Sequence, residues 1–254
     1  MAERKTIVYP NPEVLAQAVA ARTLLTIIDL LAEPDRQRVD IAVTGGTDGI
    51  YVLKVMGESP LADAVDWRRV HVWWGDERFV AADDDDRNAK QAREAWFGKL
   101  IEDDLMPAGN IHEMPADGRD ADEIASASPE QTDAVLAAAA AEYQRELVEQ
   151  LGSEPALDIA MFGVGPDAHF ASLFPDHGEV EIDDPHVLVA GVRDSPKPPP
   201  LRLTLTVPMI ARSKHTWCSP PKSVRPARSR RLRPAQQPAC PKLLRRWRGT
   251  ALAH

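Results

Sequence analysis

Two side chains that can hold and transfer a proton, Asp167 and His169, follow a short apolar run at residues 159–162. The run has the length of a buried strand, and Gly163 and Gly165 end it. A strand that ends in a glycine-containing loop is a typical position for a site in an α/β protein, because the carboxyl ends of the strands open onto a crevice. A plain glycine turn carrying a surface histidine is the alternative.

A second loop, Gly45-Gly46-Thr47-Asp48-Gly49, separates an expected strand at residues 39–44 from an expected helix at residues 50–56. Backbone N–H groups in such a turn, together with the positive N-terminal end of the helix, can bind a phosphate group. The loop has neither the dinucleotide-binding nor the P-loop spacing. A tight turn without a ligand therefore stays open as an interpretation.

A third strand end, at residues 70–74, is followed by Gly75 and the charged residues Asp76, Glu77 and Arg78. The acidic run at residues 83–86 is most simply a solvated loop. Three expected strands thus end in loops that carry glycine or charged residues.

Strands and helices alternate along the chain, which predicts an α/β fold with a largely parallel sheet and helices on both faces. The prolines at residues 196–200 keep that stretch extended. Residues 117–128 are polar and are expected to be loop, and residues 170–174 are expected to form one helical turn. The expected strands are residues 6–9, 39–44, 70–74, 110–114, 159–162, 186–192 and 202–207, and the expected helices are residues 12–33, 50–56, 89–100 and 129–150, with Asn11 capping the first and Asn88 the third.

Charge is distributed unevenly in this chain of 254 residues and net charge −9. Residues 218–254 contain ten Lys or Arg and no acid, which leaves a net charge of −19 for residues 1–217. An acidic body argues against nucleic acid as the main partner, except non-specifically through the basic tail. With only two cysteines, Cys218 and Cys240, we expect no disulfide framework and no cysteine zinc site. The chain shows no signal-peptide pattern and no 18-residue apolar run, so we expect a cytoplasmic protein without a membrane span.

Four segments together resemble the glucosamine-6-phosphate isomerase/6-phosphogluconolactonase family, over about residues 6–217. They are the Gly45-Gly46 turn, WGDER at residues 74–78 with Asn88 behind it, GVGPDAHFASLFP at residues 163–175, and SPKPPPLRLTLT at residues 195–206. The resemblance implies a Rossmann-like three-layer fold and hydrolysis of 6-phospho-D-glucono-1,5-lactone to 6-phospho-D-gluconate, in the oxidative pentose phosphate pathway. It implies no metal or cofactor, and we expect a monomer.

The same resemblance assigns the expected site residues. His169 is the general base on water, a role that suits imidazole because its pKa is near 6.5. Asp167 orients the imidazole or binds a sugar hydroxyl. The phosphate is expected against Gly45, Gly46, Thr47 and Asp48, with Arg78 as a charge-assisted contact. Lys197 and Arg202 are expected to help hold either the phosphate or the oxyanion that develops during hydrolysis.

Less specific interpretations remain. Arg78 could form an ion pair with Asp76 or Glu77, and Lys197 could be a solvated loop charge. A glucosamine-6-phosphate deaminase or isomerase of the same fold is an alternative activity. A third possibility is a non-catalytic protein that binds sugar phosphate, or nucleic acid through the tail, including an inactive product with an aberrant C-terminus.

The chain departs from the family pattern at three places. Ala168 stands where the family has glycine before the histidine, which would be strained if the backbone there has positive φ. Asp48 places a carboxylate beside the expected phosphate. After Trp217 the pattern ends, and we expect residues 218–254 to be a disordered or frame-shifted tail on a domain of residues 1–217. A lost strand and helix would uncover apolar surface, so we expect the chain to be unstable or poorly soluble.

Overall fold

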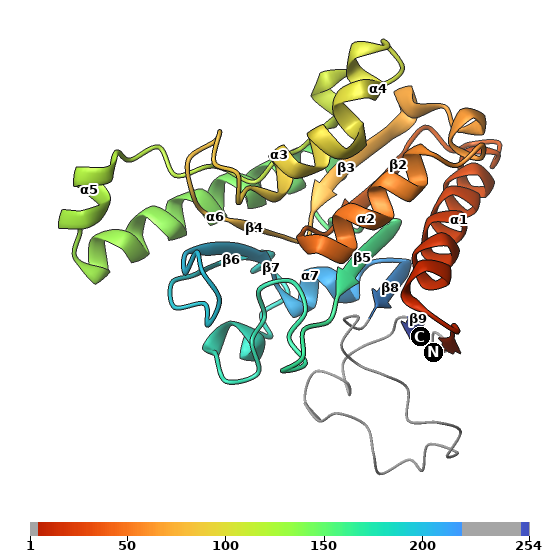
Figure 1. The fold of residues 1–254 in the computed structure, drawn as a ribbon. Helices are drawn as coiled ribbons and strands as arrows, with labels where there is room; N and C mark the ends of the chain where they lie inside the picture. Colours follow the sequence, from red (N-terminus) through yellow and green to blue (C-terminus); the bar gives the residue numbers. More distant parts are fainter. Residues whose placement is uncertain (1–4, 220–249, 254) are drawn as a thin grey trace.

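The computed structural model describes residues 5–219 and 250–253 of the chain. Its larger sheet has the strand order β1-β9-β8-β5-β2-β3, and every neighbouring pair is parallel (Figure 1). The strands are β1 (Thr6–Val8), β2 (Val39–Val43), β3 (Val70–Trp74), β5 (Ile159–Gly163), β8 (His215–Ser219) and β9 (Thr250–Ala253). Residues of β2, β3 and β5 are buried almost throughout, as expected where helices cover both faces of a parallel sheet.

Helices lie on both faces of this sheet, so the predicted layering is confirmed. Adjacent residues of a strand point to opposite faces. On one face, α1 (Pro12–Leu31) and α2 (Gly46–Gly57) pack against each other and against the sheet. On the other, Tyr143 of α6 (Pro129–Leu151) meets Trp73 edge to face, with ring centroids 5.9 Å apart. Asn11 caps α1 as expected, since its Oδ1 accepts the Val14 N–H at 2.8 Å.

A second, antiparallel sheet was not anticipated from the sequence. It has the order β4-β7-β6, formed by β4 (Asp76–Arg78), β7 (Arg202–Leu205) and β6 (Val189–Val192). The chain passes from the first sheet to the second at Gly75, whose carbonyl accepts the Leu205 N–H at 2.9 Å. A Cβ at Gly75 would lie 2.5 Å from the Phe162 ring, so this corner requires glycine.

Two segments differ from the sequence-based expectation. Within residues 117–128, expected to be loop, Asp120 and Glu123 form a capping box that starts α5 (Ala121–Ser126). Phe170 does not begin a helical turn; it forms isolated bridges with Val164 and Leu173, because the loop folds back on the end of β5.

The remaining helices connect the strand ends. The segment expected as one helix over residues 89–100 consists of α3 (Asn88–Ala92), a π-helix at Arg93–Phe97 and α4 (Gly98–Glu102). The short helix α7 (Val207–Ala211) follows β7. The expected strand at residues 110–114 is reduced to a single bridge between Ile111 and Val72.

The chain beyond Trp217 is described in two parts. β8 continues through Ser219 beside β5, two residues past the expected domain boundary. Thr250–Ala253 forms β9, which lies between β8 and β1 in the larger sheet. The other residues of the tail, 220–249 and 254, lie outside the described residues.

Helix α1 is long and apolar enough, by length and composition alone, to cross a membrane. In this fold, however, Leu15, Val19, Leu24 and Ile27 are buried in the hydrophobic core. The helix is therefore accounted for as a core helix of the parallel sheet.

A polar cluster lies near the amino end of β3. His71 Nδ1 is 2.9 Å from His112 Nε2, and His112 Nδ1 is 2.6 Å from Glu146 Oε1. Burial, together with the charges of Arg38 and His112 and against the opposing charge of Asp40, lowers the pKa of His71 to about 4. His71 is thus neutral in the folded protein at neutral pH.

Candidate active site

His169 and Asp167 are joined directly. His169 Nδ1 lies 2.5 Å from Asp167 Oδ1, and the histidine side chain is 13% exposed while the aspartate is 44% exposed. The imidazole also packs on Phe174, with ring centroids 4.7 Å apart. With Nδ1 bonded to a carboxylate, the proton of the neutral ring is on Nδ1, and Nε2 is left as the acceptor.

The loop after β5 holds this pair through close backbone contacts. Gly165 N–H donates to the His169 carbonyl at 2.7 Å, and the Ala168 N–H donates to the Gly165 carbonyl at 2.9 Å. A Cβ at Gly165 would fall 2.1 Å from His169 Cε1, so the imidazole can pack there only on a glycine. Ala168 has φ 69°, which confirms that the position before the histidine has positive φ.

Lys197 lies close enough to Asp167 to affect its titration. Burial raises the pKa of Asp167, but the hydrogen bond and charge of His169, with a smaller effect of Lys197, bring the pKa below its usual value. The Lys197 loop is held by Ser195, whose Oγ donates to the Lys197 carbonyl at 3.0 Å. Asp167 thus contacts His169 directly and is within electrostatic range of Lys197.

Arg78 and Arg202 are directly opposite each other on the antiparallel strands β4 and β7. Arg202 donates to the Lys197 carbonyl at 3.2 Å, which connects this arginine pair to the histidine group. Burial lowers the pKa of Arg202, as does the Arg78 charge, against the opposing charges of Asp76, Glu77 and Asp86. Two arginines directly opposite each other in the sheet, one of them buried, favour an anion near them.

Within the described part of the chain, Arg78 forms no ion pair with Asp76 or Glu77, so that alternative is not supported. Its guanidinium donates to the Asp86 carbonyl at 2.6 Å, and its buried Nε has no hydrogen-bond partner among the described residues. Glu77 accepts the backbone N–H of Arg78 at 2.7 Å rather than pairing with the side chain. The Arg78 side chain thus keeps donor capacity for a ligand.

The glycine turn forms the N-terminus of α2. Gly45 is the N-cap residue without a side-chain cap, and Gly46, with φ 75°, begins the helix. The first N–H groups of a helix have no partner within it, so a turn without a capping side chain presents them to an anion. Thr47 is exposed and Asp48 is partly buried in the first turn of the helix.

Three residues that sequence reasoning did not assign to the site connect its loops. Glu77 accepts the N–H groups of Asn88 and Ala89 at 2.7 and 2.9 Å, so the cap of α3 comes from Glu77, and the expectation that Asn88 caps this helix is wrong. Asn88 Nδ2 donates to the Asp76 carbonyl at 2.9 Å. Ser172 Oγ donates to Asp76 Oδ2 at 2.7 Å, which ties the histidine loop to β4. Only the burial of Glu77 and Asn88, which the sequence does not reveal, distinguishes them from surface residues.

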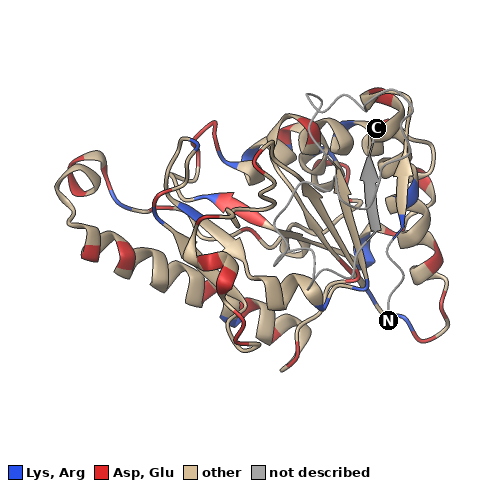
Figure 2. Ribbon diagram, turned by 90° about the horizontal axis from the view of Figure 1, so that it is seen from below, with Lys and Arg blue, Asp and Glu red and all other residues tan. Residues whose placement is uncertain are grey.

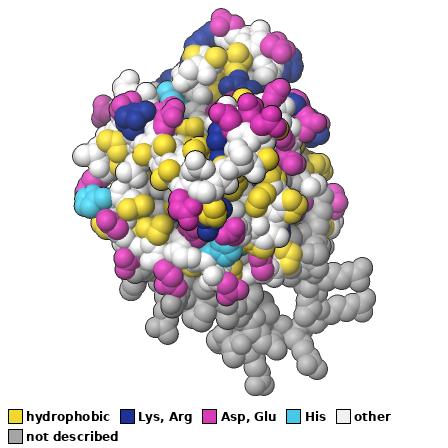
Figure 3. Space-filling view, turned by 90° about the vertical axis from the view of Figure 1, so that its left-hand side faces the viewer, with side chains coloured by type: hydrophobic (Ala, Val, Ile, Leu, Met, Phe, Trp, Pro, Cys, Tyr) yellow, Lys and Arg dark blue, Asp and Glu magenta, His cyan; other side chains and the backbone are white. Residues whose placement is uncertain are grey.

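These groups follow the carboxyl ends of three adjacent strands of the larger sheet. The turn at Gly45 follows β2, the Asp76–Arg78 strand follows β3, and the histidine loop follows β5, and these three strands are adjacent. Acidic residues are spread along the ribbon (Figure 2), and acidic side chains are scattered over the face shown in Figure 3. Arg78, Lys197 and Arg202 are the basic residues that these loops and strands offer to an anion within an acidic body.

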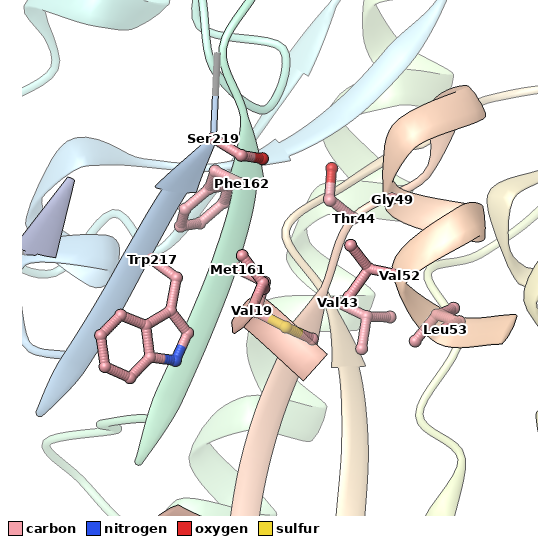
Figure 4. Close-up of a pocket in the computed structure, with 10 residues that line it drawn as sticks. All are labelled: Val19, Val43, Thr44, Gly49, Val52, Leu53, Met161, Phe162, Trp217 and Ser219. Carbon is pink, nitrogen blue, oxygen red and sulfur yellow. The ribbon is translucent and has the colours of Figure 1, made fainter. Parts of the chain in front are cut away.

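A separate small cavity of about 20 Å³ lies behind the glycine turn, between α1, α2 and the sheet (Figure 4). Its walls are mainly apolar, with Val43, Met161, Phe162 and Trp217 among the side chains that line it. Such a lining does not suit a sugar phosphate, so we assign the candidate site to the loops at the sheet edge. Within the described residues no group of three or more His, Cys, Asp or Glu is placed to hold a metal ion.

Comparison with known proteins identifies the family of this chain. A family model described as glucosamine-6-phosphate isomerases/6-phosphogluconolactonase matches residues 10–221. A 6-phosphogluconolactonase from Streptomyces coelicolor is 38% identical over 216 residues, which cover 83% of this chain and 76% of the relative. One from Mycobacterium tuberculosis is 37% identical over 210 residues, with 83% and 78% covered.

The fold is also shared with solved structures. The 6-phosphogluconolactonase from Trypanosoma cruzi superposes with a TM-score of 0.76 at 22% identity, covering 100% of this chain and 95% of that one. At that identity the likeness concerns the fold, and the sequence match carries the family assignment. The chain therefore belongs to the glucosamine-6-phosphate isomerase/6-phosphogluconolactonase family.

Proposed function

We propose that this chain hydrolyses 6-phospho-D-glucono-1,5-lactone to 6-phospho-D-gluconate, the lactone step of the oxidative pentose phosphate pathway. The observation that carries the proposal is the His169–Asp167 pair, 2.5 Å apart, in the same loop network as three basic side chains. The family assignment supports it, since the relatives compared above are named 6-phosphogluconolactonases.

The mechanism uses His169 as general base. Nδ1–H is donated to Asp167, so Nε2 takes a proton from a water molecule as the water oxygen attacks the lactone carbonyl carbon. Asp167, whose pKa is lowered, stays ionised and stabilises the imidazolium that forms. The tetrahedral intermediate then collapses: the bond from the carbonyl carbon to the ring oxygen breaks, and that oxygen receives the proton from His169.

The basic residues and the glycine turn would bind the phosphate and stabilise the negative charge that develops during the reaction. Arg78 and Arg202, in register on β4 and β7, would hold the phosphate together with the N–H groups at the start of α2. Lys197, beside Asp167, would stabilise the oxyanion that develops on the carbonyl oxygen. Asp48 fits this arrangement only with its carboxylate turned from the phosphate.

The test is lactone hydrolysis followed by proton release, with spontaneous opening of the lactone subtracted. We expect His169→Ala to lower kcat by about 10²–10⁴-fold, the usual contribution of a general base. The matched control is His186→Ala, because His186 is an exposed histidine that no proposed step uses. Equal enzymatic rates for the His169 variant and the unmodified chain would refute the assignment.

A second activity within the family is deamination or isomerisation of glucosamine 6-phosphate, because the matching family model includes those enzymes. Release of ammonia or formation of a ketose phosphate from glucosamine 6-phosphate, without lactone hydrolysis, would favour it. The proposal further includes a monomer in the cytoplasm, which size-exclusion chromatography with light scattering and cell fractionation would test.

A further inference from the structure

Asn88 lies between the glycine turn and β4, the two segments that the proposed function assigns to the phosphate. It is the first residue of α3 and only 1% exposed. A Cβ placed on Gly45 would fall 1.7 Å from Asn88 Oδ1 and 2.1 Å from its Cγ, so the amide packs directly on the Cα of the glycine turn. No side chain at position 45 is compatible with the Asn88 side chain in this position.

Asn88 is also hydrogen-bonded to the two residues that precede Arg78. Asn88 Nδ2 donates to the Asp76 carbonyl at 2.9 Å, and the Asn88 backbone N–H donates to Glu77 Oε1 at 2.7 Å. Asp76 and Glu77 are the two residues that precede Arg78 on β4. The amide therefore spans the gap between the backbone of the glycine turn and the strand that carries Arg78.

The buried amide is not explained by stability alone. Its Oδ1 has no hydrogen-bond partner among the described residues, although the residue is almost fully buried. A buried polar atom without a partner costs free energy, so a purely structural spacer would be better served by a group without that oxygen. The cost points to a role of the amide at the site.

We propose that Asn88 is a positioning residue for phosphate binding, which sets the separation between the N–H groups after Gly45 and the Arg78 guanidinium. A phosphate bound by both must fit that separation, and a bidentate guanidinium contact tolerates little displacement. This inference rests on the proposed function, since it assumes that the turn and Arg78 hold the same phosphate.

The principal variant is Asn88→Asp, which has nearly the same shape but cannot donate to the Asp76 carbonyl. We expect its KM for the lactone to rise at least about 10-fold while kcat stays within about threefold, because binding is lost and the His169–Asp167 pair is not touched. Asn88→Ala should raise KM similarly. A structural role would instead change the melting temperature and leave KM as it was.

The matched control is Asn110→Ala. Asn110 is also a buried asparagine beside β3, but its amide donates to the Arg68 and Val70 carbonyls, each at 3.0 Å, near the amino end of that strand. We expect this variant to lower the melting temperature and to leave KM unchanged. KM values for Asn88→Asp and Asn88→Ala equal to that of the unmodified chain would overturn the inference.

A double-mutant cycle tests the contact itself. Gly45 has φ −84°, which a side chain tolerates, so the obstacle to Gly45→Ala is the clash with Asn88. Gly45→Ala should raise KM strongly in the unmodified chain and much less in the Asn88→Ala background. Equal effects in the two backgrounds would contradict the proposed contact.

Inorganic phosphate, titrated by calorimetry, separates this inference from the proposed reaction. We expect phosphate to bind the unmodified chain and to bind Asn88→Asp at least about 10-fold more weakly. A chain that binds phosphate in this Asn88-dependent way but does not hydrolyse the lactone would sink the proposed reaction and keep the inference. Equal phosphate binding by both proteins, or none by the unmodified chain, would sink the inference.

Discussion

Replacing Ala168 with glycine should stabilise the protein, because Ala168 has φ 69° beside the proposed catalytic histidine. A residue with a Cβ pays about 1–2 kcal/mol for this left-handed conformation, and glycine does not. Glycine also gains freedom in the unfolded chain, which offsets about 0.4–1 kcal/mol of that relief. The net increase in the free energy of unfolding is therefore about 0.5–1 kcal/mol, or a rise of roughly 1–4 °C in Tm for a domain of this size.

The assay is thermal unfolding followed by circular dichroism or calorimetry at one pH and one protein concentration. The control is Ala138→Gly, the same substitution at an exposed position inside α6, where glycine should cost about 1 kcal/mol. The two variants should thus shift Tm in opposite directions. A fall in Tm for Ala168→Gly comparable to that of the control would refute the argument that position 168 is strained.

Three further predictions concern the site, the pH dependence and the tail. Asp167→Asn should lower kcat on the order of 10-fold or more with little change in KM, because the amide cannot stabilise the imidazolium; an unchanged kcat in the proton-release assay would contradict this. His71 has a pKa of about 4 in the folded protein against about 6.5 in the unfolded chain. The free energy of unfolding should therefore decrease as the pH falls from about 6.5 to about 4, because in this range the unfolded chain binds a proton that the folded protein does not. His71→Gln should flatten this part of the pH dependence of the unfolding free energy by about 1–2 kcal/mol, after allowance for the partial exposure of the ring, and parallel curves for the two proteins would argue against it. We propose that the composition change after Trp217 reflects a shifted reading frame; the coding DNA should then contain a single-base insertion or deletion near codon 217 whose correction gives a family-like ending.

Much of the larger sheet could be predicted from local sequence. The apolar runs at β2, β3 and β5 have strand length and end at glycine, and Asn11 with Pro12 marks the start of α1, because these signals depend on neighbouring residues only. The antiparallel sheet could not be predicted in the same way. Its strand β4 is only three residues long and charged, and it is a strand because β7, more than 100 positions later, supplies its hydrogen bonds.

The sequence by itself determined which groups are available for chemistry: His169 with Asp167 in one loop, a glycine turn, and Arg78, Lys197 and Arg202 as basic residues. Tertiary structure alone decided how they are combined. It placed Arg78 opposite Arg202, brought Lys197 within electrostatic range of Asp167, and put Asn88 against Gly45. The physical reason is that residue type and spacing report local backbone preference, whereas hydrogen bonds and charges between distant segments depend on strand order and register, which only the packed sheet defines.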